Sequence, residues 1–482
     1  MKKLILLVLV LSMTLTFLPS CAEEQEEEAA ETTASTVEAA TDIPVKDMQE
    51  RTITFLTYNR GGGYTTTPEI LKTEEQADVI NDAIVSRNLT IEENYNVKIE
   101  CYEDENIVEE LNRLTLAGSD GSEVDFVIPS QSYAIAMMVA GHLVPLNDLP
   151  YLNFGAEYWD SNMIADTAIG GKNYMMQCDM NWVAWDTTYL VFFNKRIATE
   201  ENIEDMYALV DEGKWTFETY AEISQRVYRD DGDTVVDKDD TFGTSACNVC
   251  VDAFMIGAGI TYIQKDANGY LVLPSSTTEQ MDNIFNEIVD FCNASETLYT
   301  DHPAYKAQRV QIAHDTFTEG RALFFVDCLA TYTDLKYMED EFGMLPLPKY
   351  DEEQKEYYTF SHFQNGSCLA IPQMAKDVDD LALIAEAIAY YSHDTVRPAY
   401  INNILEGRIA QAENDYRMID KITSNYLYDF GLILYDYGVP VNTTVRMLVT
   451  NNLKALSSQM KSVQKMYSAK VEAINAKVSE ID

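Results

Sequence analysis

The amino-acid sequence predicts an α/β fold class on three observations. Segments with strand-like and helix-like patterns alternate from residue 52 to residue 140, as in a sheet covered by helices. Residues 124–128 form a short stretch that is apolar except for Asp125, which is typical of a strand buried in a parallel sheet. The chain of 482 residues is 46% hydrophobic and 23% charged, which is a globular composition. Its length predicts two or three domains.

The alternating region begins with a strand at 52–58, where β-branched and apolar residues alternate. Gly118 and Gly141 follow two predicted helices and mark their ends, because glycine readily adopts the left-handed conformation that closes a helix. The other elements predicted in this region are helices at about 73–94, 106–117 and 132–140 and strands at 97–102 and 124–128.

The rest of the chain alternates less regularly. Thr216 is predicted to cap a helix that runs to about residue 228. From about residue 377 to the end the pattern is almost entirely helical, and the last segment, 445–481, is amphipathic and lacks Gly and Pro. The other elements predicted here are strands at 172–177, 189–194, 322–326 and 368–371 and helices at about 277–293 and 304–319.

The first residues predict export from the cytoplasm. Lys2 and Lys3 precede a short apolar run, which together indicate a secretory signal peptide over residues 1–20. The run is too short to predict a membrane-spanning helix. Cys21, directly after a small residue, resembles the lipobox of bacterial lipoproteins, which implies lipidation of Cys21. Ordinary secretion with an incidental cysteine is the alternative.

Residues 21–50 predict a tether between a lipidated Cys21 and the folded body. The segment after the cysteine is rich in Glu, Ala and Thr and has no aromatic residue, so it lacks the apolar surface needed to fold by itself. We therefore expect the protein at the extracytoplasmic face of the cell membrane, attached to the membrane through the lipid anchor only.

The charge of the chain excludes one class of partner. Its formal net charge is −45 at pH 7. Nucleic-acid binding requires clustered Lys and Arg, so no nucleic-acid partner is expected. A strongly acidic body slightly favours neutral or cationic ligands over anionic ones.

The cysteines predict small buried thiols. Besides Cys21 there are seven, and an odd, scattered set does not indicate a disulfide framework. Cys247 and Cys250 form a lone Cys-x-x-Cys pair without the second pair of ligands that a zinc site needs. Buried packing of these thiols is the simplest interpretation.

Four segments of the chain carry a resemblance to a known family. They are Tyr189–Lys195, Gly213–Thr216, Phe317–Leu323 and Gly343–Lys349. Taken in order, they resemble the bacterial extracellular solute-binding proteins of the sugar-transport type, the group that includes maltose-binding protein. Phe193, in the first of them, stands where that group usually has Tyr. The resemblance covers roughly residues 52–450.

This resemblance implies a periplasmic-binding-protein-like fold of type II, with two α/β lobes joined by a hinge and a ligand cleft between them. Lobe one is expected at 51–170 plus 325–376, and lobe two at 171–324 plus 377–482. The crossings between lobes are expected near residues 170–172, 323–327 and 371–376. The C-terminal helices pack either on lobe two alone or also across the cleft.

The resemblance also implies a function and partners. The chain would capture a sugar or oligosaccharide as a monomer and deliver it to an ABC transporter permease, without covalent chemistry. Two alternatives stay open. The first is a surface glycan-capture protein without a permease. The second is a glycoside hydrolase, which needs a pair of carboxylates defined in space rather than in sequence. No Gly-x-Ser-x-Gly, His-Glu-x-x-His or phosphate-loop motif is present.

Eight residues are predicted to contact the ligand. Some follow the ends of predicted strands, where ligands bind in open α/β sheets, and their alternative role is in turns. The others are aromatic and acidic groups near the expected crossings, whose alternatives are core packing or a solvated loop. The eight are Tyr58, Asn59, Ser130, Gln131, Trp182, Trp185, Asp186 and Asp327.

An acidic segment, residues 230–240, suggests a structural calcium site, since calcium takes several carboxylate oxygens. Counted from Asp231, the positions that an EF-hand fills with Gly and Glu hold Val236 and Phe242, so the segment is not an EF-hand. A looser calcium loop and a solvated acidic turn remain open, and no other cofactor is expected. The predicted calcium ligands are Asp231, Asp233, Asp237 and Asp240.

Overall fold

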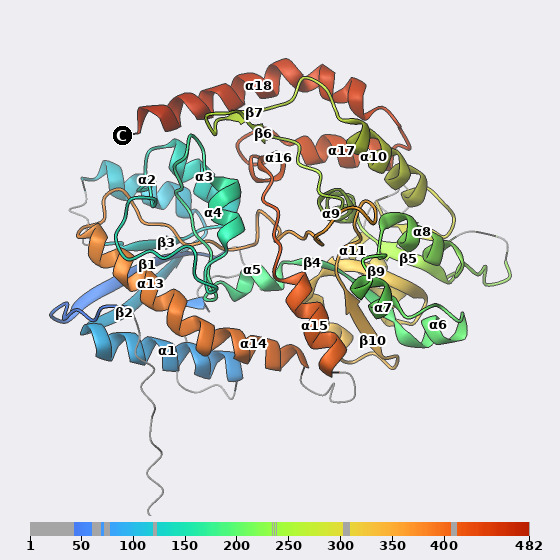
Figure 1. Cartoon of the computed structure of the whole chain (residues 1–482), viewed down its shortest axis with the longest axis horizontal. Helices are drawn as coiled ribbons and strands as arrows, with labels where there is room; N and C mark the ends of the chain where they lie inside the picture. The colour runs from blue at the N-terminus through green and yellow to red at the C-terminus, as the bar shows by residue number, and fades with distance from the viewer. Residues whose placement is uncertain are drawn as a thin grey trace, which may run out of the picture. The chain divides into compact units, whose positions relative to one another are not determined.

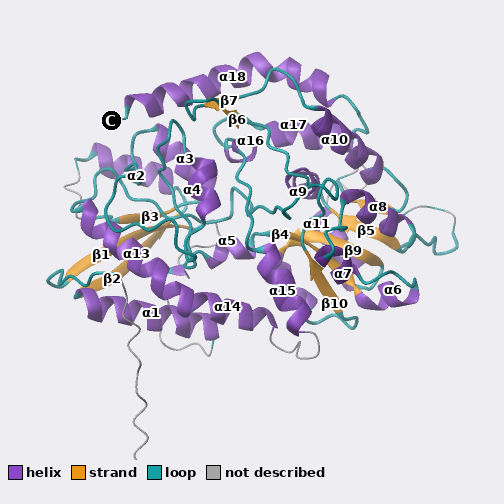
Figure 2. Cartoon of the chain, in the orientation of Figure 1, coloured by secondary structure: helices purple, strands orange, loops and turns teal. Residues whose placement is uncertain are grey.

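The computed structural model describes residues 43–59, 69–71, 78–118, 123–233, 235, 237, 239–301, 309–405 and 412–481. The predicted signal peptide, Cys21 and most of the predicted tether lie outside these residues. Ile43–Asp482 forms one compact unit. Most of its strands gather in two groups, one in each half of the unit (Figure 2).

The first group is a parallel three-stranded sheet in the order β2-β1-β3. It is formed by β1 (Arg51–Tyr58), β2 (Val97–Asp104) and β3 (Phe126–Ile128). Alternate side chains point to opposite faces of a strand. Phe55 packs in one core with residues of α1 (Val79–Tyr95) and α13 (Val378–Asp394). Leu56 packs in the other core with residues of α2 (Ile107–Leu116) and α3 (Gln131–Val139). Helices therefore cover both faces of this sheet.

The second group is a mixed five-stranded sheet in the order β10-β4-β9-β5-β8. β9 runs parallel to β5, which runs parallel to β8, while β4 runs antiparallel to its neighbours β9 and β10. Its five strands are β4 (Tyr189–Asn194), β5 (Phe242–Ala246), β8 (Thr297–Tyr299), β9 (Ala322–Cys328) and β10 (Phe342–Leu345). The carboxyl ends of β5, β8 and β9 consequently share one edge with the first residue of β4.

Helices surround both sheets, and a short hairpin of β6 (Gln264–Lys265) and β7 (Leu271–Val272) lies near the C-terminal helix (Figure 1). The helices up to β9 are α1 (Val79–Tyr95), α2 (Ile107–Leu116), α3 (Gln131–Val139), α4 (Ser161–Thr167), α5 (Trp182–Asp186), α6 (Lys195–Glu200), α7 (Met206–Asp211), α8 (Phe217–Gln225), α9 (Val249–Gly257), α10 (Glu279–Cys292) and α11 (Arg309–Thr318). Those after β9 are η3 (Leu329–Thr331), α12 (Tyr332–Leu335), α13 (Val378–Asp394), α14 (Val396–Leu405), α15 (Ala412–Ile422), α16 (Phe430–Ile433), α17 (Val441–Thr450) and α18 (Leu456–Glu480).

Side-chain caps begin several of these helices where the sequence predicts a start. Thr216 accepts a hydrogen bond from the Thr219 N–H and begins α8, which confirms the predicted cap. Ser130 accepts from the Tyr133 N–H at the start of α3 in the same way. A cap of this kind typically stabilises a helix by about 1 kcal/mol.

Two predicted strands, 172–177 and 368–371, are extended segments without a regular ladder. Single bridges join Met176 to Leu369 and Ala370 to Val127 of β3. Val127 and Ala370 exchange both backbone hydrogen bonds, at 2.9 and 3.0 Å. β3 has only three residues, so its neighbours find too few partners to form longer strands.

The predicted amphipathic segment 445–481 is two helices rather than one. α17 ends at Thr450 and α18 begins at Leu456. Asn452, between them, has φ 54°, a left-handed conformation that asparagine tolerates better than most residues. α18 contacts α3 on one side and α10 and α17 on the other, so it packs against both halves of the unit (Figure 1). None of the helices that the structure describes is long and apolar enough to span a membrane.

The arrangement of the strands differs from the expected lobe boundaries in three places. β9 and β10 both pair within the second sheet, although residues 325–376 were expected in lobe one. α13, expected in lobe two, packs on α1 beside the first sheet. Gly170 bonds to the hairpin through the Gly269 carbonyl rather than crossing between sheets. β9 keeps its partners β4 and β5 along most of its length, so the return to the first sheet comes later, near residues 361–370.

Candidate ligand-binding cleft

Two overlapping cavities, of about 410 and 880 Å³, open at the carboxyl edge of the second sheet. We call them the inner and outer cavities and, together, the cleft. Both are lined by Asn248, Val249, Arg309, Val310, His362 and Asn365. The inner cavity adds Thr187, Tyr189, Cys247, Gln311, His314, Asp327, Cys328, Thr331 and Asp334, and the outer adds Phe363, Gln364, Tyr435, Asn442, Thr443, Arg446, Met447, Thr450 and Asn451.

The strand directions place polar groups at this edge. β5 ends at Ala246 and the chain turns through Asn248 into α9, while β9 ends at Cys328 directly after Asp327. β4 runs the opposite way, so its first residue, Tyr189, faces Cys328 across the ladder. Ligands of open α/β sheets bind outside the carboxyl ends of strands, which is where the cleft lies.

The inner cavity holds Asp327, which is one of the predicted ligand residues. Burial raises the pKa of Asp327, and the Cys328 N–H, which donates to its carboxylate at 2.7 Å, opposes that effect. His314 lies nearby, with its Nε2 3.7 Å from an oxygen of Asp334. This cavity therefore offers carboxylate acceptors beside an imidazole, which can donate or accept.

The outer cavity rests on a buried ion pair between α17 and α9. The Asp252 carboxylate is fully buried and accepts from the Arg446 guanidinium and, at 3.3 Å, from Asn442 Nδ2. Burial disfavours the charge on Arg446, but the adjacent Asp252 more than offsets it, so the pKa of Arg446 is raised. The pair fixes the α17 residues that line the cavity.

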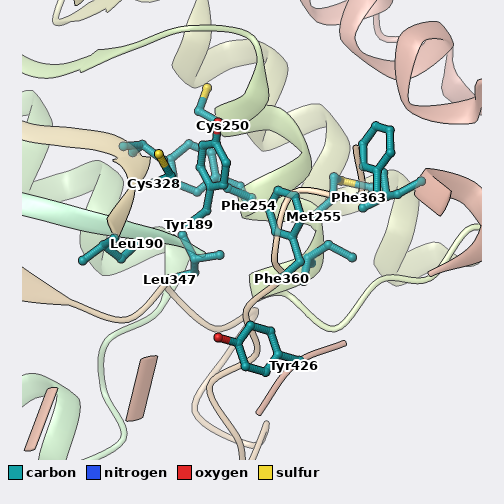
Figure 3. Close-up of a cluster of buried hydrophobic side chains, with 14 of the residues drawn as sticks. Tyr189, Leu190, Cys250, Phe254, Met255, Cys328, Leu347, Phe360, Phe363 and Tyr426 are labelled. Atoms are coloured by element: carbon teal, nitrogen blue, oxygen red, sulfur yellow. The ribbon is translucent and has the colours of Figure 1, made fainter. Parts of the chain in front are cut away.

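Aromatic rings form part of the cleft wall. Tyr189 stacks on Phe360 with the ring centroids 5.1 Å apart, and Phe363 lies 5.7 Å from Tyr435. Figure 3 shows Tyr189 and Cys328 close together among the buried apolar side chains beneath the cleft. These rings are anchored in the core, so the surface that they present to the cleft is rigid.

The four residues predicted at the end of the first sheet lie elsewhere and do not line the cleft. Tyr58 is 6% exposed, with its ring 4.9 Å from that of Tyr133, and Asn59 donates to Glu103. Ser130 caps α3, and Gln131 is 1% exposed. Ligand contact by these residues stays a prediction, and the contacts found for them are structural.

Trp182, Trp185 and Asp186 lie on α5 and pack against Tyr400 of α14. The Tyr400 ring lies 5.1 Å from Trp185 and 6.2 Å from Trp182, and its hydroxyl donates to Asp186 at 2.6 Å. Burial raises the pKa of Asp186 to about 6. These three side chains attach α5 to α14, whereas Thr187, which the sequence analysis missed, lines the inner cavity.

The acidic loop brings together a different set of carboxylates from the one predicted. Asp230, Asp231 and Asp233 each place an oxygen within 4.8 Å of the others, and all three are exposed. Asp240 is buried, and its oxygens accept from the backbone N–H groups of Asp231 and Asp237 and from the Tyr228 hydroxyl. Asp240 thus organises the loop, and calcium binding stays a prediction.

Most cleft residues were missed because they come from distant parts of the chain. Asn248 follows β5, His314 lies on α11 and Arg446 lies on α17. No local spacing joins them. The one available signal was the strand Phe242–Ala246, and its Gly, Thr and Ser residues made that strand hard to recognise.

A family model described as bacterial extracellular solute-binding protein matches residues 90–393, which is more than half of the chain. No curated protein matches the sequence.

Solved structures share the fold at low sequence identity. UgpB from Mycobacterium tuberculosis in complex with glycerophosphocholine has a TM-score of 0.55 at 14% identity, covering 87% of this chain and 98% of that one. The ABC substrate-binding protein Lmo0181 from Listeria monocytogenes in complex with cycloalternan has 0.51 at 12%, covering 86% and 99%. A family 1 extracellular solute-binding protein from Bifidobacterium longum subsp. infantis has 0.52 at 11%, covering 89% and 99%. The fold is therefore of the type II periplasmic-binding-protein class.

Proposed function

Because the chain belongs to the bacterial extracellular solute-binding proteins, we propose that it captures a carbohydrate, in particular an oligosaccharide, in the cleft and delivers it to an ABC permease. Proteins of this family are carriers rather than enzymes. The proposed carrier works as a monomer at the outer face of the cell membrane, held there by a lipid on Cys21 and by the tether that follows it.

The chemistry of the cleft is the observation that carries this proposal. Sugar hydroxyls both donate and accept hydrogen bonds, and amide and carboxylate side chains such as Asn248, Asn365 and Asp327 match them. The anchored rings beside them suit the apolar C–H face of a sugar. Pockets built this way combine apolar surface with a few placed polar groups.

The charges in the cleft favour a neutral ligand over an anionic one. Both lining guanidinium groups are engaged by carboxylates, Arg309 by Asp301 at 2.5 Å and Arg446 by the buried Asp252. Asp327 and Asp334 add negative charge to the inner cavity. The anionic phosphodiester group of a ligand such as the glycerophosphocholine bound to UgpB would meet carboxylates here, whereas a neutral glycan such as the cycloalternan bound to Lmo0181 has no anionic group to be repelled.

Thermal unfolding in the presence of candidate ligands tests the proposal. The purified chain without residues 1–20 is screened with mono- and oligosaccharides and with glycerophosphocholine. A ligand that binds only the folded state at one hundred times its Kd stabilises by about 2.7 kcal/mol, which raises Tm by several degrees. We expect this shift with one family of glycans. A shift with glycerophosphocholine alone, or no shift with any glycan, would contradict the carbohydrate assignment.

A further inference from the structure

A separate cavity of about 300 Å³ adjoins α5 and shares no lining residue with the cleft. We call it the α5 cavity. Its walls come from three parts of the chain: the segments 155–161 and 177–179, the helices α5 and α14 through Trp185 and Arg397, and the segment 423–426 that follows α15. None of the functions discussed above uses this cavity.

One buried polar atom in the wall lacks a partner. Gln177 is 2% exposed, and its Nε2 donates to Asp160 at 3.4 Å. Its Oε1 has no hydrogen-bond partner among the residues that the structure describes. A buried acceptor left in this state is costly, so native proteins supply it with a donor. Because Gln177 lines the cavity, that donor can come from a molecule inside it.

The groups around this atom are mainly acceptors with negative charge. Asp160, Asp179 and Glu157 supply three carboxylates. Two basic side chains lie beside these carboxylates. The Arg397 guanidinium is 3.1 Å from Asp179. The His393 ring is 2.6 Å from Asp179 and 3.5 Å from Glu157. Arg397 and the His393 ring both contact Asp179, which leaves little positive charge facing Asp160 and Glu157.

Arg397 cannot turn toward Gln177 without losing its own contacts. Its guanidinium carbon lies 5.6 Å from the Trp185 ring centroid, and a nitrogen lies 3.9 Å from Asp420. The Asp160 carboxylate accepts from two backbone N–H groups of α4 and from the Tyr428 hydroxyl, at 3.0, 3.1 and 2.6 Å. Burial raises the pKa of Asp160 to about 6, so this carboxylate is largely ionised above that pH.

We propose that the α5 cavity binds a small primary ammonium ion, which donates an N–H to Gln177 Oε1 and whose charge Asp160 and Glu157 balance. The two requirements are separate. The unpartnered oxygen calls for a hydrogen-bond donor, and the nearby carboxylates favour a positively charged one. A quaternary ammonium ion meets only the second requirement, and a neutral polyol meets only the first.

Thermal unfolding of the purified full chain distinguishes these classes. The probes are ethanolamine hydrochloride, choline chloride and glycerol at pH 7.5 and matched ionic strength. We expect Tm to rise with ethanolamine concentration and to saturate, with at least fivefold weaker effects from choline and glycerol. Equal effects of all three, or no effect of ethanolamine because the cavity holds water only, would overturn the proposal.

A matched pair of glutamine variants assigns the effect to this cavity. Gln177→Met removes the unpartnered oxygen and keeps the side-chain length. Gln464→Met is its control, because Gln464 Oε1 also lacks a described partner but Gln464 is not among the residues that line the α5 cavity. We expect Gln177→Met to weaken ethanolamine binding at least tenfold and Gln464→Met to leave it unchanged. The same ethanolamine response in both variants would overturn the assignment.

A second variant keeps the test valid if Gln177→Met fails to fold. The Glu157 side chain is 82% exposed, so Glu157→Gln leaves the core untouched while it removes one of the balancing charges. We expect several-fold weaker ethanolamine binding in this variant, and unchanged binding would overturn the charge argument. Neither measurement depends on a carbohydrate, so failure here is separable from failure of the proposed transport function.

Discussion

The carboxyl ends of the two sheets look alike in sequence but differ in what covers them. In the first sheet two residues separate β3 from α3, and in the second sheet two residues separate β5 from α9. At the first end, backbone and side-chain groups of Ser132 bond to Phe363 and Ile433, which places other chain segments over the turn. At the carboxyl end of the second sheet, the space over the turn between β5 and α9 is the cleft. A polar residue after a strand is therefore available to ligand only where nothing else packs on it.

The ion pair beneath the outer cavity gives the largest expected effect. Asp252→Ala removes the fully buried member of the pair and leaves the Arg446 guanidinium, whose side chain is 15% exposed, without its carboxylate. Breaking a buried pair in this way typically costs about 3–5 kcal/mol. Chemical denaturation should show that loss. The control is Asp290→Ala, whose pair with Lys454 is exposed and should cost no more than about 1 kcal/mol. Equal losses in the two variants would mean that α17 is not held by the buried pair.

A second pair of variants tests the comparison of the two sheet ends directly. Asp327→Ala, in the inner cavity, should weaken binding of the glycan found by thermal screening by about 1.5–3 kcal/mol, since it removes a charged acceptor. Gln131→Met, at the covered end of the first sheet, should leave the affinity unchanged. Calorimetric titration measures both. A larger loss from Gln131→Met than from Asp327→Ala would reverse our assignment of the cleft.

The pH dependence of stability tests whether Asp186 is a core group. Its pKa is raised to about 6 in the folded state by burial, above the value of about 4 for an unfolded chain. Between these values the folded state binds more protons, so this group makes the free energy of unfolding fall as pH rises from 4 to 6, and the loss persists above pH 6. Asp186→Asn should remove this dependence, which amounts to about 2.7 kcal/mol for a shift of about two pKa units. An unchanged pH profile in urea denaturation would contradict burial of an ionisable Asp186.

The acidic loop, at the edge of the second sheet opposite the cleft, gives the smallest expected effect. The acidic loop precedes β5, and its three clustered carboxylates are exposed. If the predicted calcium site exists, calcium should raise Tm by a few degrees more than magnesium does, and Asp231→Asn should abolish the difference. Identical melting curves in calcium and magnesium for the unaltered chain would end the calcium prediction.

Some residues of the cleft could be predicted from the sequence and others could not, as Asp327, Trp185 and Thr187 show. Asp327 was predicted because it directly follows a recognisable apolar strand, and it lines the cleft. Trp185 was predicted because it lies between two predicted strands near an expected crossing, yet it packs on Tyr400, while Thr187, two residues later, lines the cleft. Successive side chains on α5 point in different directions, and only its packing partner α14 shows which direction is buried.

Local pattern alone determined the existence of β1, β2, β3 and β4, the cap at Thr216 and the resemblance to solute-binding proteins, because alternation and capping depend on neighbouring residues. Tertiary structure decided β5, where a Cβ on Gly243 would lie 1.9 Å from the Ser224 carbonyl oxygen. Tertiary structure also brought Asn248, His314 and Arg446 to one edge. Such contacts join residues far apart in the chain, and their free energy comes from close packing and shared burial, which no short stretch of sequence records.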